Sequence, residues 1–173
     1  NDLGYEAYQA TVSPVSSNYD RSVELYHYIK GGTVDYGAAH AKEHGHARYG
    51  RTFPGIYPEW DENHPIHLVG HSMGGLTSRG VIDLLEDGSE EERAYQQAHP
   101  EETISSLFEG GKSWVHSATS IGTPHNGSTF ADNENLIIDF IKDFVLNIST
   151  VTGISKENFL YDFKLDQWGI RRQ

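Results

Sequence analysis

One serine in this sequence lies in a pattern that could make it a nucleophile. Residues Gly70 to Gly74 read G-H-S-M-G and match the pattern G-x-S-x-G. An apolar run, 66–70, precedes the serine, and helical spacing of apolar residues follows over 76–85. This context predicts a strained strand-to-helix turn that exposes Ser72, in which side chains two positions to either side would collide with the turn. We expect Ser72 to attack a carbonyl carbon and the backbone N–H of Met73 to stabilise the oxyanion.

The acid and base that a serine nucleophile needs are harder to find. In chain order they should follow as an acid and then a histidine, each after a later strand. The histidines after Ser72 are His99, His116 and His125, and His125 lies just past the end of a predicted strand. No acid precedes it in the right order, so a structural loop histidine is the favoured interpretation. The missing partners indicate that the chain is an interior segment of a longer enzyme.

A second group of residues could bind a metal ion. Asp20, His40 and His46 offer one carboxylate and two imidazoles, a set that suits zinc. The spacing alone leaves alternatives, because His40 and His44 would share one face of a helix. Taken from the residues alone, surface histidines in a polar loop are the favoured interpretation.

Composition excludes several classes of function. The formal net charge is −12, with 13 Lys and Arg against 25 Asp and Glu, which excludes binding to a polyphosphate such as nucleic acid. The chain has no cysteine, so it has no disulfide, thiol nucleophile or thiolate metal site. No run approaches the roughly 18 apolar residues of a transmembrane span, and no signal segment begins at Asn1. A neutral substrate fits this composition best.

Strands alternate with helices along the chain. Apolar periodicity and turn residues predict strands at 5–12, 66–70 and 114–121, helices at 21–30, 76–85 and 90–98, and a loop over 33–57 with one short helix near 37–44. We expect Asn18 or Asp20 to cap the first of these helices, and Gly31-Gly32 to end it. This order predicts an α/β domain with a parallel sheet and helices on both faces. There is no internal repeat and no linker, so residues 1–173 are interpreted as a single partial domain.

A further amphipathic helix is predicted near the end of the sequence. Within the candidate helix 134–154, apolar residues recur at spacings of three and four from Leu136 to Ile148, with Asp139, Lys142, Asp143 and Asn147 between them. Such a helix could cover an active site in water and turn its apolar face toward lipid. A helix buried against the sheet explains the same pattern.

Several segments together resemble one known family. The sequence is similar to the secreted true lipases of the Bacillus/Geobacillus and staphylococcal group over nearly its whole length. The segments that carry the resemblance are 16–21, 31–50, 70–75, 123–127 and 166–169, of which 31–50 is the most specific. The resemblance implies an α/β-hydrolase fold with a helical lid region at 134–154 and a zinc region inserted at 33–57. It also implies a secreted, extracellular triacylglycerol lipase that meets its lipid substrate at an oil–water interface and uses a Ser-His-Asp mechanism.

The resemblance assigns roles residue by residue. Ser72 corresponds to the nucleophile and Met73 to an oxyanion donor, while Asp20, His40 and His46 correspond to three of four zinc ligands. The fourth zinc ligand, the catalytic Asp and His and the calcium ligands would all lie outside this chain. Two other functions stay open: a non-catalytic module that binds zinc or a lipid surface, and a short-chain esterase or phospholipase. The oligomeric state is not indicated.

Overall fold

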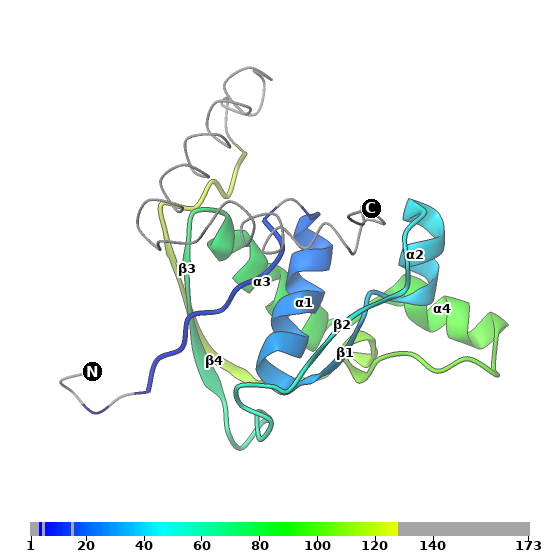
Figure 1. Ribbon diagram of the computed structural model, residues 1–173, viewed down its shortest axis with the longest axis horizontal. Coiled ribbons are helices and arrows are strands. Elements are labelled where there is room, and N and C mark those ends of the chain that lie inside the picture. The colour runs from blue at the N-terminus through cyan, green and yellow to red at the C-terminus, as the bar shows by residue number, and fades with distance from the viewer. Residues whose placement is uncertain (1–3, 5, 15, 128–173) are drawn as a thin grey trace, which may run out of the picture. The chain divides into compact units, whose positions relative to one another are not determined.

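The predicted nucleophile lies between a strand and the helix that directly follows it, beside a second, parallel strand. The computed structural model describes residues 4, 6–14 and 16–127. Strand β3 (Ile66–His71) leads into helix α3 (Met73–Glu86) and pairs in parallel with β4 (Val115–Ile121), so that His67 stands opposite Ser117. Helix α3 packs against both strands (Figure 1). The predicted strand–helix–strand order and the parallel pairing are confirmed.

The two faces of this strand pair differ in their cover. Leu68, 8% exposed, and Gly70 point toward α3, whereas Val69, between them on the opposite face, is 70% exposed. Parallel sheets usually have both faces covered. Within the described ranges the structure shows helical cover on the α3 side, so the predicted second layer stays a prediction.

Helix α1 (Asn18–Lys30) packs against α3 and supplies much of the core. The helix begins at Asn18, three residues before the predicted start at Arg21. The predicted caps, Asn18 or Asp20, were wrong, because the side chain of Ser17 caps the helix by accepting a hydrogen bond from the Asp20 N–H at 3.0 Å. The helix ends at Gly31 as expected, where φ is +95°. The fully buried core side chains are Val23, Val34, Trp60, Val81, Leu85, Leu107 and Phe108.

The segment after α1 contains more structure than its sequence predicted. Strand β1 (Gly32–Asp35), helix α2 (Ala38–His44) and strand β2 (Tyr49–Phe53) follow one another, and β1 pairs with β2 in antiparallel orientation. The short helix is confirmed, but the loop predicted around it contains these two strands. They escaped prediction because buried and exposed residues do not alternate along either strand. Their pairing has a register shift between Thr33 and Asp35.

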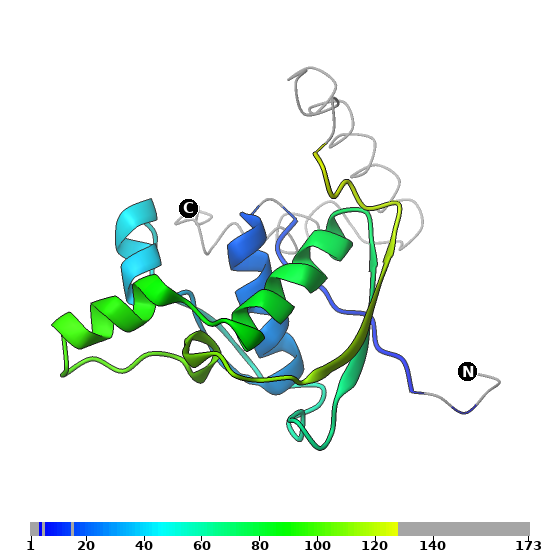
Figure 2. The ribbon, with the colours of Figure 1, turned by 180° about the vertical axis from the view of Figure 1, so that it is seen from behind.

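Helix α4 (Glu90–Ala98) and the 3-10 helix η1 (Ser106–Glu109) complete the described elements. The predicted helix at 90–98 is confirmed, and the Ser89 hydroxyl caps it by accepting from the Glu92 N–H. The strand predicted at 5–12 is wrong for its described residues, which form no ladder with another strand. Figure 2 shows that α4 lies beside α2, although the two helices are far apart in the sequence.

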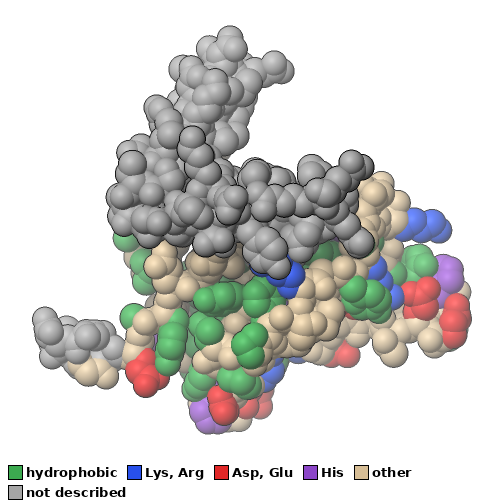
Figure 3. All heavy atoms as spheres, viewed as in Figure 1, with side chains coloured by type: hydrophobic (Ala, Val, Ile, Leu, Met, Phe, Trp, Pro, Cys, Tyr) green, Lys and Arg blue, Asp and Glu red, His purple; other side chains and the backbone are tan. Residues whose placement is uncertain are grey.

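The chain divides into two compact units, residues 1–123 and 124–173. The candidate lid at 134–154 and the segment 166–169 lie outside the described residues, and the single partial domain stays a prediction. None of the described helices is long and apolar enough to cross a bilayer. In the space-filling view, hydrophobic side chains gather near the middle of the described surface and acidic ones lie mainly toward its edges (Figure 3).

Candidate active site and metal group

Ser72 occupies a strained turn between β3 and α3. Its φ of +53° is the only positive value among the described non-glycine residues, and its ψ is −126°. Such a backbone conformation costs free energy and persists only where the surroundings enforce it. The Ser72 N–H donates to the carbonyl of Ile121 at 2.9 Å, which ties the turn to the end of β4. The side chain is half-buried, and Met73 begins the helix.

The glycines around Ser72 do not all serve the same purpose. A Cβ at position 70 would stand 2.5 Å from backbone atoms of Gly74 and Gly75, so no side chain fits there. A Cβ at position 75 would stand 2.1 Å from the Thr123 hydroxyl. At position 74, by contrast, no described atom outside the helix's own backbone lies within 4 Å. The expected collision is therefore confirmed before the serine and is wrong after it, where the crowded position is 75.

Helix α1 holds the first turn of α3 in place. The Asn18 amide donates to the carbonyl of Leu76 at 3.3 Å, and the Ser22 hydroxyl interacts with the carbonyl of Thr77 at 3.2 Å. The guanidinium of Arg21, which is 8% exposed, lies 3.6 Å from the sulfur of Met73. Burial lowers the pKa of Arg21. These contacts from α1, which the sequence did not reveal, fix the helix whose first N–H belongs to Met73.

The histidines that follow Ser72 have different surroundings. His99 stacks on Tyr95 with ring centroids 4.1 Å apart and places Nδ1 2.9 Å from that residue's carbonyl oxygen. His116 packs against His67 with centroids 4.9 Å apart. Both arrangements are structural. His125 belongs to the second unit and remains unassigned, as the sequence left it.

Asp20, His40 and His46 come together as a candidate metal group. They come from α1, from α2 and from the loop before β2, and one potential ligand atom of each lies within 4.8 Å of the others. The Oδ1 of Asp20 is 3.0 Å from His40 Nε2 and 3.9 Å from His46 Nε2. Their side chains are 9%, 10% and 16% exposed, respectively. The predicted trio is thus brought together, whereas His44 only packs its ring 4.4 Å from that of His40.

The chemistry of the donor atoms suits a metal ion. His46 Nδ1 lies 3.0 Å from the carbonyl oxygen of Ala47, which can only accept, so in the neutral imidazole Nδ1 carries the hydrogen and Nε2 has a free lone pair. That Nε2 is buried and has no hydrogen-bond partner. Metal-binding histidines commonly present one nitrogen to the ion while the other donates to a carbonyl. An unpartnered buried acceptor is costly, and a cation at this point would satisfy it.

The carboxylate of the group is held in its charged form. Burial raises the pKa of Asp20, but interactions with His40 and Ser17 outweigh burial, and the net result is a lowered pKa. Metal ligands must be deprotonated, and a lowered carboxyl pKa keeps Asp20 in its ionised form down to a lower pH. The ring of Tyr19 stacks on that of His40 with centroids 4.0 Å apart, which restricts rotation of the imidazole.

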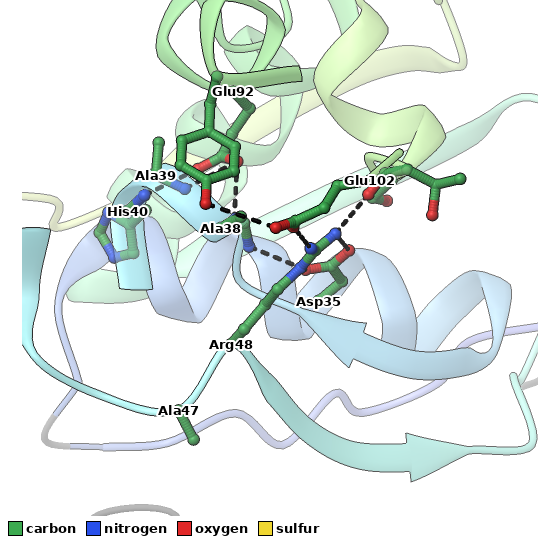
Figure 4. Close-up of polar contacts among 12 residues, drawn as sticks. Asp35, Ala38, Ala39, His40, Ala47, Arg48, Glu92 and Glu102 are labelled. Atoms are coloured by element: carbon green, nitrogen blue, oxygen red, sulfur yellow. Dashed lines mark hydrogen bonds and ion pairs between the residues drawn. The ribbon is translucent and has the colours of Figure 1, made fainter. Parts of the chain in front are cut away.

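Charged side chains hold both ends of the segment that carries His40 and His46. Glu92 of α4 accepts hydrogen bonds from three successive backbone N–H groups at the start of α2, ending with that of His40 (Figure 4). Arg48 binds both carboxylate oxygens of Asp35, at 2.9 and 3.0 Å, and also Glu102 at 2.7 Å. The sequence missed these residues, because nothing in a run of three glutamates distinguishes the buried one.

Comparisons with known proteins show which proteins this chain resembles. The family model for the lipase-like C-terminal domain matches residues 1–173. Lipase 1 of Staphylococcus aureus (strain MRSA252) is 50% identical over 98% of this chain, which spans 25% of that protein. The structure of lipase 1 from Pelosinus fermentans matches with a TM-score of 0.85 and 55% identity over 99% of this chain and 45% of that one. Staphylococcus hyicus lipase matches with a TM-score of 0.79 and 43% identity, over 99% and 43% respectively. The chain therefore spans about a quarter of the length of the curated relatives it matches.

Proposed function

Because this chain belongs to the family of lipase-like C-terminal domains, we propose that it is part of a lipase in which Ser72 is the nucleophile. The observation that carries the proposal is the backbone of Ser72. A φ of +53° is a costly conformation for a non-glycine residue, and Ser72 adopts it at a strand–helix junction. Such strain is typical of sites where a reactive group must be exposed. We also propose that the parallel strands belong to an α/β-hydrolase fold.

The mechanism follows from the turn. A base removes the Ser72 proton as Oγ attacks the ester carbonyl carbon, and the carbonyl oxygen gains negative charge. The N–H of Met73, at the start of α3, donates to that oxyanion and lowers the barrier. The alcohol leaves with a proton, and water then releases the fatty acid from the acyl-enzyme. The histidine and acid for these steps are proposed to lie outside this chain, as the family resemblance implies.

Asp20, His40 and His46 are proposed to hold a structural zinc ion. The free lone pair of His46 and the ionised carboxylate of Asp20 support this assignment. The ion would link α1 to the segment 33–57 and needs a fourth ligand from elsewhere. Calcium, which the family resemblance also implies, has no ligand assigned among these residues.

The proposed substrate is a triacylglycerol at an oil–water interface, met outside the cell. Its support is the similarity to proteins named as lipases. The segment 134–154, which lies outside the described residues, stays the proposed lid. If its apolar face meets lipid, activity should increase sharply once an emulsion forms.

Hydrolysis by the complete protein tests this function. Wild type and Ser72→Ala would be compared on emulsified trioleoylglycerol, tributyrin and a phospholipid. We expect wild type to cleave the long-chain triester and the variant to lose turnover. Preference for tributyrin alone would indicate a short-chain esterase, and preference for the phospholipid a phospholipase. Full activity of Ser72→Ala would reject the nucleophile.

A further inference from the structure

We propose that Glu92 is a positioning residue for the metal group, acting through the first turn of α2. This inference rests on the proposed metal site and adds a residue that binds no metal itself. Glu92 lies on α4, is 0% exposed, and comes from a part of the chain remote from Asp20 and His40. Its carboxylate sets where the backbone of His40 stands, and so where the His40 imidazole meets Asp20.

The contacts of the carboxylate are specific. Oε2 accepts from the N–H of Ala38 at 2.7 Å and of Ala39 at 3.2 Å, while Oε1 accepts from the N–H of His40 at 2.8 Å. These are N–H groups that a helix start leaves without intrahelical partners. A Cβ at Gly37 would stand 2.2 Å from Oε1, so the carboxylate fills the space that the glycine leaves open. Figure 4 shows Glu92 directed at this first turn.

Helix α2 depends on outside support. It spans Ala38–His44, and Gly37 at its N-cap provides no side-chain hydrogen bond. Isolated helices of this length are unstable in water, because nucleation is costly. A negative charge at the N-terminus offsets that cost by charge-assisted hydrogen bonds and by the helix dipole. Glu92 therefore replaces the cap that the sequence of α2 lacks.

The same turn carries a candidate ligand. The N–H of His40 binds Glu92, and the Nε2 of His40 lies 3.0 Å from Asp20 Oδ1. The other end of the segment that carries the two histidines is fixed by Arg48, which lies two residues after His46. Arg48 forms ion pairs with Asp35 and Glu102. The hydrogen bonds from Glu92 and the ion pairs of Arg48 therefore fix the segment that carries His40 and His46 near both of its ends. Loss of the Glu92 carboxylate would leave three backbone N–H groups without their acceptor, and the backbone of His40 would no longer be held in place.

Zinc affinity of the complete protein tests the proposal. Glu92→Gln would be compared with Glu91→Gln, which removes the same charge from an exposed neighbour. Competition with a chromophoric chelator gives the zinc dissociation constant, and the visible spectrum of bound Co²⁺ reports ligand geometry. Loss of an outer partner typically weakens metal binding by about 10–100-fold, and we expect this for Glu92→Gln with an altered cobalt spectrum. Glu91→Gln should match wild type in both measurements.

Three results decide the matter. If circular dichroism shows Glu92→Gln folded, with wild-type zinc affinity and cobalt spectrum, the positioning role is rejected. If Glu92→Gln does not fold, Glu92→Asp takes its place: it keeps the charge but shortens the reach, and unchanged affinity there rejects the role equally. If wild type binds no zinc, and His46→Ala changes nothing, the metal site itself is wrong and this inference falls with it.

Discussion

Replacing Gly70 by alanine should damage both the fold and the reactivity of the Ser72 turn. The added Cβ would stand 2.5 Å from the carbonyl carbon and oxygen of Gly74 and from the nitrogen of Gly75. All three are backbone atoms in the first turn of α3, so no side-chain rotation relieves the contact. The strand end or the helix start has to move.

The size of the effect follows from that distance. Ordinary contact begins at 3.4 Å, so the backbone must shift by 3.4 − 2.5 = 0.9 Å. Overpacking of a packed site costs about 1–3 kcal/mol, and because no side-chain rotation relieves a contact with backbone, we place Gly70→Ala near 3 kcal/mol. A misplacement of about 1 Å lowers the rate of an enzymatic step by roughly 10²-fold. We expect phosphonate labelling of Ser72 to slow by about that factor.

The assay pairs urea unfolding with the rate of phosphonate labelling in the complete protein. Gly74→Ala is the matched control, since no described atom outside its own helix lies within 4 Å of the added methyl group. Alanine is favoured over glycine inside a helix by about 0.5–1 kcal/mol, so this variant should be as stable as wild type or slightly more so. A wild-type labelling rate for Gly70→Ala, or equal losses in both variants, would show that the space left by Gly70 does not determine the shape of the Ser72 turn.

Further outcomes follow from the metal group and the core. His46→Ala should abolish zinc-dependent stabilisation in thermal melts, which amounts to about 2.7 kcal/mol at a zinc concentration 100 times Kd, whereas His44→Ala should retain it. Arg48→Lys removes the bidentate hydrogen bonding to the Asp35 carboxylate. This variant should weaken zinc binding without abolishing it, as measured by competition with a chelator. Burial lowers the pKa of His27, so the folded state binds fewer protons there than the unfolded state. Stability should therefore fall as pH drops below about 6.5 in urea titrations, and His27→Gln should flatten that dependence.

The parts of the fold that sequence predicts are those with local signals. The apolar run before Ser72 and the helix after it were readable because a buried strand and an amphipathic helix each have their own periodicity. The end of α1 was readable because Gly31 adopts a positive φ that favours glycine. Strands β1 and β2 could not be predicted in this way, because each is stabilised by pairing with the other strand and not by an apolar pattern of its own.

The residues of the candidate metal site also differ in how far their sequence predicts them. Asp20, His40 and His46 could be nominated from residue type, and the resemblance to a family favoured them over His44, but their convergence depends on how α1 and α2 pack. Glu92 had no signal at all, since a glutamate in the first turn of a helix is ordinarily solvated and serves its own helix dipole. Its burial against another helix start exists only in three dimensions.

The most direct test of the account is to locate the covalent bond formed by an alkylphosphonate ester. The complete protein would be labelled with a p-nitrophenyl alkylphosphonate, digested and analysed by tandem mass spectrometry. We expect the phosphonate to be attached to Ser72, and one equivalent of label to abolish hydrolysis of triacylglycerol. Attachment at another residue, or full hydrolysis by protein labelled at Ser72, would contradict it.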